Sequence, residues 1–212
     1  MHPFRLPTAL RRLLPAECLW QMPATERTLY LTFDDGPIPD ETPFVLEQLA
    51  HFQAQATFFC VGDNLVKHPA VARQALAAGH RLANHTFHHL SAWSHAADAW
   101  LRDVQLCQDA LDALRPAPPE PRPLLRPPYG RITPALVRAV AARYQVVMWD
   151  VLTCDYDATL APEKSLRASI RHSQPGTIVV FHDSRKASRN LRYVLPRYLE
   201  HFAQQGYSFA KL

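Results

Sequence analysis

Short apolar runs alternate with amphipathic stretches along most of the chain. Continuous apolar or β-branched runs bounded by turn residues predict buried strands, and apolar residues spaced three or four apart predict helices. Strands are predicted at 28–33, 56–61, 81–83, 124–126, 145–151, 177–183 and 207–211. Helices are predicted after Thr42-Pro43, from about residue 69 to Gly79, over 92–114, after Thr133-Pro134, over 162–172 and over 190–204.

Strands that alternate with helices indicate an α/β fold, in which a mostly parallel sheet is covered by helices. In such folds reactive residues collect at the carboxyl ends of the strands. We predict one catalytic domain over 28–212, preceded by an N-terminal extension over 1–27 that packs on it. The proline-rich stretch 116–123 is interpreted as a stiff surface loop within that domain.

Composition is that of an ordinary globular domain. The chain has 212 residues, of which 48% are hydrophobic and 20% charged, and this excludes a disordered tail or a fibrous repeat. Lys and Arg exceed Asp and Glu by 23 to 19, but no run of like charges forms a basic arm, so no nucleic-acid partner is expected. The densest basic clusters, Arg11-Arg12 and Arg185-Lys186 with Arg189, are interpreted as solvated surface.

The cysteines and the apolar segments indicate in which cellular compartment the protein is expected. Cys18, Cys60, Cys107 and Cys154 are widely spaced without a C-x-x-C pair, which predicts free buried thiols. No segment reads as a signal peptide or a membrane span, so a cytoplasmic monomer is expected, with a periplasmic or membrane-peripheral location left open. A weak peripheral membrane contact could use Leu10, Leu13, Leu14, Leu19 and Trp20, although packing of these side chains on the domain is favoured.

Two segments could supply a metal site. Asp34 and Asp35 end the first strand before a Gly-Pro turn, which could equally be a simple solubilising turn. His85 and His89 are four residues apart, and on a helical turn they would share a face as paired zinc ligands, whereas His88 would not. A carboxylate from Asp34 or Asp35 would complete a set of ligands that leaves coordination open for water and substrate.

Two further strand ends could supply acid–base chemistry. Arg126 follows the fourth predicted strand, where its guanidinium could hold a base carboxylate ionised, or could simply be a surface group on a proline turn. His182 ends the sixth strand and, paired with a carboxylate, would suit a general acid; an isolated histidine there could also be purely structural.

Five motifs occur in the chain in a fixed order. They are TFDDGP at 32–37, H-T-x-x-H at 85–89, RPPYG at 126–130, the stretch 149–155 and V-x-H-D at 180–183. With these motifs the chain resembles the polysaccharide deacetylase family, the NodB-type carbohydrate esterases, from about Thr28 to the C-terminus. The resemblance implies a distorted, incomplete (β/α)7 barrel and a metal-dependent hydrolase that removes N-acetyl groups from amino sugars of a glycan or glycolipid.

The resemblance also implies roles for individual residues. Asp34 matches the catalytic base and Arg126 the residue that pairs with it. His182 matches the general acid, oriented by Asp155, and the backbone N–H of Tyr129 matches an oxyanion donor. The matching metal ligands are Asp35, His85 and His89, and the walls of the acetyl pocket are Trp149 and Val180.

Some questions stay open on the sequence. Tyr156 stands where the family often has Trp, which alters the groove wall. The metal is expected to be zinc, although the same ligands suit Co²⁺ and other divalent ions. Alternative functions are hydrolysis of another non-peptide C–N bond, and carbohydrate binding without catalysis.

Overall fold

A computed structural model describes residues 4–5, 7, 11, 13–115 and 120–212. Seven strands form a parallel sheet in the order β5-β4-β3-β2-β1-β7-β6, and β8 pairs with β1. The ends of this order, β5 and β6, are not paired with each other, so the curled sheet is an incomplete barrel. The predicted fold class is therefore confirmed. The strands are β1 (Thr28–Asp34), β2 (Thr57–Cys60), β3 (Arg81–Asn84), β4 (Leu124–Leu125), β5 (Gln145–Val146), β6 (Val151–Leu152), β7 (Ile178–His182) and β8 (Ser208–Ala210).

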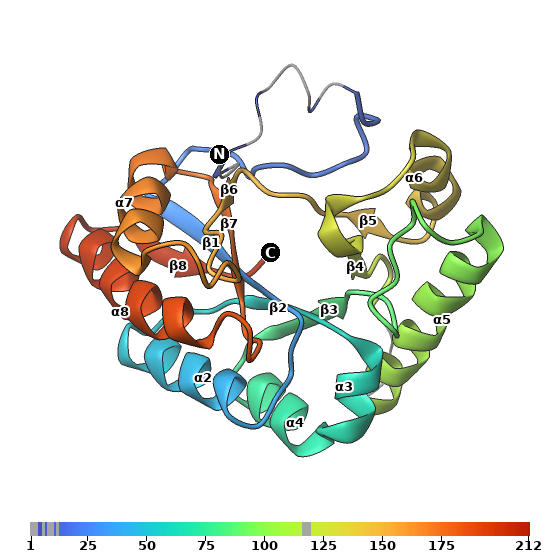
Figure 1. The fold of residues 1–212 in the computed structure, drawn as a ribbon, viewed down its shortest axis with the longest axis horizontal. Coiled ribbons are helices and arrows are strands. Elements are labelled where there is room, and N and C mark those ends of the chain that lie inside the picture. Colours follow the sequence, from blue (N-terminus) through green and yellow to red (C-terminus); the bar gives the residue numbers. More distant parts are fainter. Residues whose placement is uncertain (1–3, 6, 8–10, 12, 116–119) are drawn as a thin grey trace.

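Helices lie around the outside of this curved sheet (Figure 1). They are α2 (Glu41–His51), α3 (Gly62–Lys67), α4 (Pro69–Ala77), α5 (Ala97–Leu114), the 3-10 turn η1 (Pro128–Gly130), α6 (Pro134–Ala141), α7 (Pro162–His172) and α8 (Ser188–Gln204). Helix α6 begins as its sequence predicts, because Thr133 accepts a hydrogen bond from Leu136 N and Pro134 needs no amide partner in the first turn.

The single strand predicted over 145–151 is wrong. The chain forms β5, leaves the sheet and returns as β6. The amide of Met148 donates to Leu19 O, and the guanidinium of Arg126 donates to the carbonyls of Val147 and Met148. Because partners outside the sheet satisfy these backbone groups, the apolar run does not need to continue as a strand.

One helix prediction needs correction, and one helix was not predicted. The helix expected from residue 92 begins at Ala97, because Ser91 accepts hydrogen bonds from Trp93 N at its side chain and from Ser94 N at its carbonyl. These local bonds form a turn that competes with the helix. The short α3 was not predicted, and its first amides, of Gly62 and Asp63, donate to carbonyls of the loop that follows β3.

The N-terminal segment contacts the sheet on both sides of its opening. Leu19 bridges Val147, which follows β5, and Gln21 bridges Thr177, which precedes β7, so residues 19–21 connect segments next to these two strands. The N-terminal part of the chain is drawn in blue in Figure 1. Gly176 has φ +82, and a Cβ there would lie 2.4 Å from Met22 O. The close approach of these two backbones therefore requires a glycine at that position. The boundary predicted at residue 27 stays a prediction.

The core surrounds Phe33 of β1. Its ring stacks on Phe58 of β2 and on Phe181 of β7, with ring centroids 5.1 and 5.7 Å apart. Such packing holds the central strands together through burial of large aromatic surfaces. The four cysteines are buried and free, as predicted.

Peripheral predictions have mixed outcomes. Leu14 and Trp20 pack on a core cluster, whereas Leu13 is 71% exposed. Residues 120–123 form a loop, in which Glu120 pairs with Arg81. Leu10, Arg12 and residues 116–119 lie outside the described residues. Within the described chain, no helix is long and apolar enough to cross a membrane.

Candidate active site

A cavity of about 410 Å³ lies at the carboxyl ends of the strands. We call it the strand-end cavity. It contains eight of the ten residues singled out by the sequence; the other two, Arg126 and Asp155, lie directly behind it. The cavity is lined by Asp34, Asp35, His85, His89, Tyr129, Arg131, Trp149, Leu152, Tyr156, Val180, His182 and Lys186.

Three potential metal ligands converge in this cavity. Ligand atoms of Asp35, His85 and His89 all lie within 4.8 Å of one another. Asp35 Oδ1 is 3.2 Å from His89 Nε2 and 3.8 Å from His85 Nε2. Burial alone would raise the pKa of Asp35, but the hydrogen bond from His89 and the charge of His182 lower that pKa well below its usual value. Asp35 is therefore anionic near pH 7, as a metal-binding carboxylate must be.

The helical turn expected over 85–89 is wrong. The two histidines lie on a loop after β3, in which Thr86 has φ 63 and His89 has φ 57. Asp103 of α5 holds this loop by accepting hydrogen bonds from the amides of Phe87 and His88. The left-handed residues, not a helical repeat, therefore bring the two imidazoles together.

The remaining nitrogen of each imidazole also has a partner. His85 Nδ1 lies 2.8 Å from Arg126 O, and His89 Nδ1 lies 3.1 Å from the Tyr129 hydroxyl. Burial lowers the pKa of His85 to about 4, so this imidazole is neutral near pH 7. With Nδ1 protonated towards the carbonyl, His85 presents the lone pair of Nε2 to the space beside Asp35, as a metal ligand must.

Asp34 is held separately, by a buried arginine. The Nη1 atom of Arg126 lies 2.7 Å from Asp34 Oδ1, and both side chains are buried. The same guanidinium donates to Thr32 Oγ1 and packs over the ring of Phe59 at 4.0 Å. This network fixes one carboxylate oxygen of Asp34, while Oδ2 lies 4.0 Å from His85 Nε2, beside the potential metal ligands.

His182 pairs with a second buried carboxylate. Asp155 accepts from His182 Nδ1 at 2.7 Å and from its backbone amide at 2.8 Å. Burial would lower the pKa of His182, but the charge and hydrogen bond of Asp155, together with Asp35 and Asp34, raise it to about 9. Since His182 is paired with Asp34 across β1 and β7, a protonated imidazole lies beside the Asp34 carboxylate.

Asp183 positions the Asp34-Asp35 loop, a role that the sequence did not indicate. Its carboxyl oxygens accept from Gly36 N at 3.0 Å and from Thr42 Oγ1 at 2.6 Å. A Cβ on Gly36 would lie 2.0 Å from Asp183 Oδ2, so only glycine allows this approach. Burial raises the pKa of Asp183 to about 8. Of the two residues at the end of β7, His182 therefore lines the cavity and Asp183 holds the loop that carries Asp35.

Trp149 and Val180 line the cavity as expected, beside Tyr129. Tyr129 has φ 61 within η1, and the following Gly130 has φ +64. A Cβ on Gly130 would lie 2.5 Å from Cη2 of Trp149. The RPPYG turn therefore needs its glycine to let the indole pack against it and form the wall.

The basic clusters predicted as solvated surface are only partly so. Arg11 is 11% exposed and pairs with Asp150, a fully buried carboxylate that also accepts from Arg5. Lys186 lines the strand-end cavity, as does Arg131, which the sequence did not single out. Arg131 and Lys186 therefore lie beside the motif residues of the cavity, although neither belongs to one of the five motifs.

Comparisons with known proteins agree with this geometry. Residues 21–149 match the family model described as polysaccharide deacetylase. The chain is 34% identical to a peptidoglycan-N-acetylglucosamine deacetylase of Bacillus cereus over 90% of this chain and 88% of that protein. It is 36% identical to a chitooligosaccharide deacetylase of Bradyrhizobium over 74% of this chain and 71% of that protein.

A solved structure shows the same fold. The Bc1960 peptidoglycan N-acetylglucosamine deacetylase, solved with 4-naphthalen-1-yl-N-oxidanyl-benzamide, superimposes with a TM-score of 0.86 at 23% identity. The match covers 98% of this chain and 95% of that one. The incomplete barrel is therefore shared along nearly the whole of both chains.

Proposed function

Because the chain belongs to the polysaccharide deacetylase family, we propose that it is a metal-dependent N-deacetylase of glycans that contain N-acetylglucosamine. One observation carries this proposal. A carboxylate and a protonated imidazole, each held by its own buried partner, lie in one cavity with three convergent metal ligands. Hydrolysis of an acetamide needs a base, an acid and an electrophile in this arrangement.

The donor set fits a divalent ion. One anionic carboxylate and two imidazoles, with their second nitrogens already partnered, are typical of catalytic zinc sites that keep a position open. Asp35, His85 and His89 would hold the ion, and we propose zinc, with Co²⁺ as an alternative. When bound, such an ion supplies Lewis acidity, which lowers the pKa of a water and polarises a carbonyl.

Asp34 is proposed as the general base. Arg126 occupies Asp34 Oδ1, which leaves Oδ2 on the side of the metal ligands to accept the proton of the attacking water. The guanidinium also orients the carboxylate, since it is itself fixed by Thr32, Met148 and Phe59. As Oδ2 takes a proton from this water, the water oxygen adds to the carbonyl carbon of the acetamide. The carbonyl oxygen then gains negative charge.

Tyr129 and His182 are proposed to complete the reaction. The Tyr129 backbone N–H donates to the developing oxyanion, and one donor of this kind is worth about 3 kcal/mol. His182, kept cationic by Asp155, donates its Nε2 proton to the sugar nitrogen as the C–N bond breaks. The products are acetate and a free amine, while Trp149 and Val180 enclose the acetyl methyl.

The test is release of acetate from a panel of acetylated glycans and glycolipids, followed by mass spectrometry of the products. With zinc-loaded protein, we expect each reacting sugar to lose 42 Da, the mass difference between an acetyl group and a hydrogen. Asp34→Asn should retain the ion and lose about 10²- to 10⁴-fold in kcat, because the base is removed while the ligands stay.

Other outcomes decide against this function. Cleavage of a cyclic amide without acetate release would assign hydrolysis of a different C–N bond. Tight glycan binding by the zinc-loaded protein with no turnover of any acetamide would assign a binding protein. Full activity of Asp34→Asn would remove Asp34 from the role of base.

A further inference from the structure

Asp150 is a fully buried carboxylate that does not line the strand-end cavity and has no part in the proposed reaction. Its Oδ1 accepts from Arg5 Nε at 2.9 Å and from Arg11 Nη2. Its Oδ2 accepts from Arg5 Nη2 at 3.3 Å and from Thr177 Oγ1 at 3.4 Å. A carboxylate in a protein interior is costly unless it is paired, so Asp150 depends on these two arginines.

Both arginines come from the N-terminal segment, far from Asp150 along the chain. The guanidinium carbon of Arg11 lies 5.4 Å from the ring centroid of Trp20. Trp20 packs on the same core cluster as Trp149. The Arg11 guanidinium is therefore held by an aromatic ring as well as by the carboxylate.

The N-terminal segment also binds the backbone on both sides of Asp150. Met148 N donates to Leu19 O at 2.7 Å, and Leu152 N donates to Phe4 O at 2.9 Å. Met148 lies between β5 and β6, and Leu152 ends β6. Two backbone hydrogen bonds and one buried ion-pair cluster thus attach residues 148–152 to the N-terminal segment.

Trp149 lies within this attached stretch, directly before Asp150. Its indole lines the strand-end cavity and packs against Gly130 of the RPPYG turn. The guanidinium carbon of Arg126, which holds the proposed base, is 5.8 Å from the centroid of the same indole. A shift of the backbone at 149–150 would therefore move a wall that faces the reacting groups.

We propose that Arg5, Arg11 and Asp150 are positioning residues of the active site. By holding Asp150, the two arginines fix the indole of Trp149 where the cavity fits an acetyl group and excludes a longer acyl group. Strands β5 and β6 are the two ends of the sheet order, and the N-terminal segment holds the stretch between them in place of a neighbouring strand. This inference rests on the proposed deacetylation for the identity of the reacting group, and on the Asp150 ion pairs for the position of the wall.

A spectroscopic test reports the position of the indole without turnover. The four tryptophans are labelled as fluorotryptophan, and the Trp149 fluorine resonance is assigned by its loss in Trp149→Phe. We expect Arg11→Gln to shift or broaden this resonance in zinc-loaded protein, because a buried carboxylate that loses a partner must relocate or take up water. The resonance of the exposed Trp93 should stay unchanged, which would show that the fold is intact.

A kinetic test measures how closely the wall encloses the acyl group. The probes are oligomers of N-acetylglucosamine and of N-propionylglucosamine of equal length, which differ by one methylene per sugar. We expect wild type to prefer the acetyl probe, and Arg11→Gln to lower the acetyl-over-propionyl ratio of kcat/KM about tenfold, the effect of one methylene in a closed apolar pocket. Loss of folded protein alone would lower both rates by one factor and leave this ratio unchanged.

Conservative and control variants separate the ion pairs from net charge. Arg11→Lys keeps the charge and should recover part of the ratio. Arg27→Gln removes the same charge from an exposed arginine that donates to Gln205 O, and should leave the ratio and the Trp149 resonance unchanged. Equal changes in Arg27→Gln and Arg11→Gln would show a net-charge effect and overturn the proposal. If Arg11→Gln does not fold, Arg5→Gln replaces it in both tests, with a smaller expected change because Arg5 is 38% exposed.

A double variant tests whether Arg11 acts through Asp150. Asp150→Asn removes the buried charge, so adding Arg11→Gln to it should change the acyl ratio no further. Additive effects of the two substitutions would mean that Arg11 acts by another route, and would overturn the proposal.

The inference and the proposed function fail on different results. If wild-type protein releases neither acyl group, the deacetylase is contradicted, whereas a shifted Trp149 resonance in Arg11→Gln still supports the positioning role. An unshifted Trp149 resonance in Arg11→Gln overturns the inference even if the glycan is deacetylated. So does an active wild type that does not distinguish the two probes, or an unchanged acyl ratio in Arg11→Gln, because the wall would then not set the size of the acyl pocket.

Discussion

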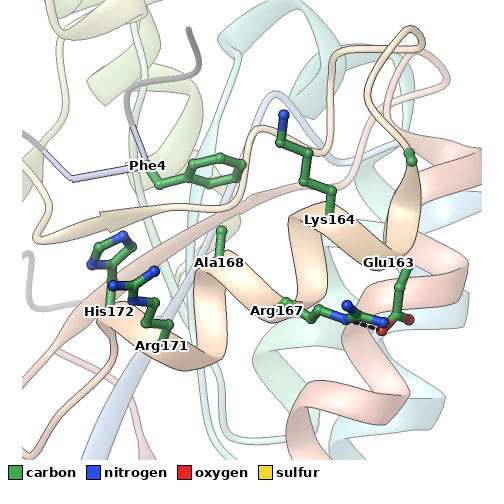
Figure 2. Close-up of a pocket in the computed structure, with 8 residues that line it drawn as sticks. Phe4, Glu163, Lys164, Arg167, Ala168, Arg171 and His172 are labelled. Carbon is green, nitrogen blue, oxygen red and sulfur yellow. Dashed lines mark hydrogen bonds and ion pairs between the residues drawn. The ribbon is translucent and has the colours of Figure 1, made fainter.

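The strand-end cavity and a second cavity beside α7 differ in how their charges are held. The second, which we call the α7 cavity, is larger, at about 540 Å³ against about 410 Å³. Figure 2 shows that it is formed by Phe4 and one face of α7. Its residues are Phe4, Ala161, Glu163, Lys164, Arg167, Ala168, Arg171 and His172.

The ion pairs in the two cavities have different surroundings. In the α7 cavity Arg167 pairs with Glu163, and their side chains are 79% and 45% exposed (Figure 2). In the strand-end cavity the side chains of Arg126 and Asp34 are 0% and 5% exposed. Exposed pairs are worth little because water screens them, whereas buried groups act on one another in a medium of low dielectric.

Cavity size therefore does not identify the reactive site in this protein. The α7 cavity draws its charges from one helix, at the spacing of one helical face. The strand-end cavity draws its groups from the carboxyl ends of β1 and β7 and from the loops after other strands, so that the proposed acid, base and metal ligands face one space. Chemistry follows this convergence of buried, partnered groups.

The largest contrast should come from removing one imidazole in each cavity. His85→Ala removes one of the three proposed metal ligands and should lose the ion, with kcat falling by at least about a thousandfold, since metal catalysis supplies several kcal/mol. His172→Ala, at the α7 cavity, should keep both the ion and the activity. Elemental analysis after dialysis, together with acetate release, measures this contrast. A stoichiometric ion in His85→Ala would remove that residue from the ligand set.

The second contrast concerns pH. His182 must be protonated to act as an acid, and its raised pKa keeps it so up to about pH 9, so activity should fall as pH rises through about 9. Asp155→Asn removes the charge that raises this pKa, so the alkaline limb of kcat/KM should move to lower pH. The pH–rate profiles of wild type and Asp155→Asn test this prediction. If the alkaline limb of kcat/KM lies at the same pH in both proteins, a group other than His182 causes that limb.

The third contrast compares two glycines with positive φ. Gly130 has φ +64 with the Trp149 ring 2.5 Å from a built Cβ, whereas Gly206 has φ +72 with nothing within 4 Å. Gly206→Ala should cost only the backbone strain, about 1–2 kcal/mol. Gly130→Ala should cost about 1–3 kcal/mol more through overpacking, and should also raise KM by displacing the cavity wall.

Urea unfolding and steady-state kinetics on the two alanine variants make this comparison. If Gly130→Ala and Gly206→Ala lose equal stability and both keep wild-type KM, then contact with Gly130 does not position Trp149.

The smallest effect is expected at the α7 cavity itself. Lys164→Gln removes an exposed charge that lines this cavity without reaching the strand-end cavity. We expect kcat/KM to stay within about twofold of wild type and the free energy of unfolding to change by less than about 0.5 kcal/mol, as for ordinary surface substitutions. A large loss of activity on any glycan would make the α7 cavity part of the substrate path.

The hydrophobic pattern predicts the positions of the strands better than the points where strands are interrupted. The strands that hold the site, β1 and β7, were predicted within a residue or two at each end, because their apolar runs are continuous and end at turn residues. The prediction of one strand over 145–151 was wrong, because Arg126 and Leu19 supply hydrogen-bond partners that end the strand there. Partners so distant along the chain leave no local pattern.

The same division applies to the site. The motifs identified Asp34, Asp35 and the three histidines of the cavity, since these polar residues stand at or directly after the ends of buried apolar strands. Asp183 was overlooked as a support, although it adjoins His182, because its partners Gly36 and Thr42 are remote in sequence. Lys186 was predicted to be a solvated surface charge and Arg131 was not singled out, because the local sequence does not show that both side chains line one cavity.

By itself, the sequence determined the α/β fold class and the chemical types of the reacting residues, because hydrophobic periodicity and residue chemistry are local properties. Only the tertiary structure decided that two histidines meet through left-handed loop residues, that Arg126 binds one oxygen of Asp34, and that Arg131 and Lys186 line the same cavity. Those outcomes depend on distances between segments far apart in the chain. Packing of the strands and loops against one another sets these distances.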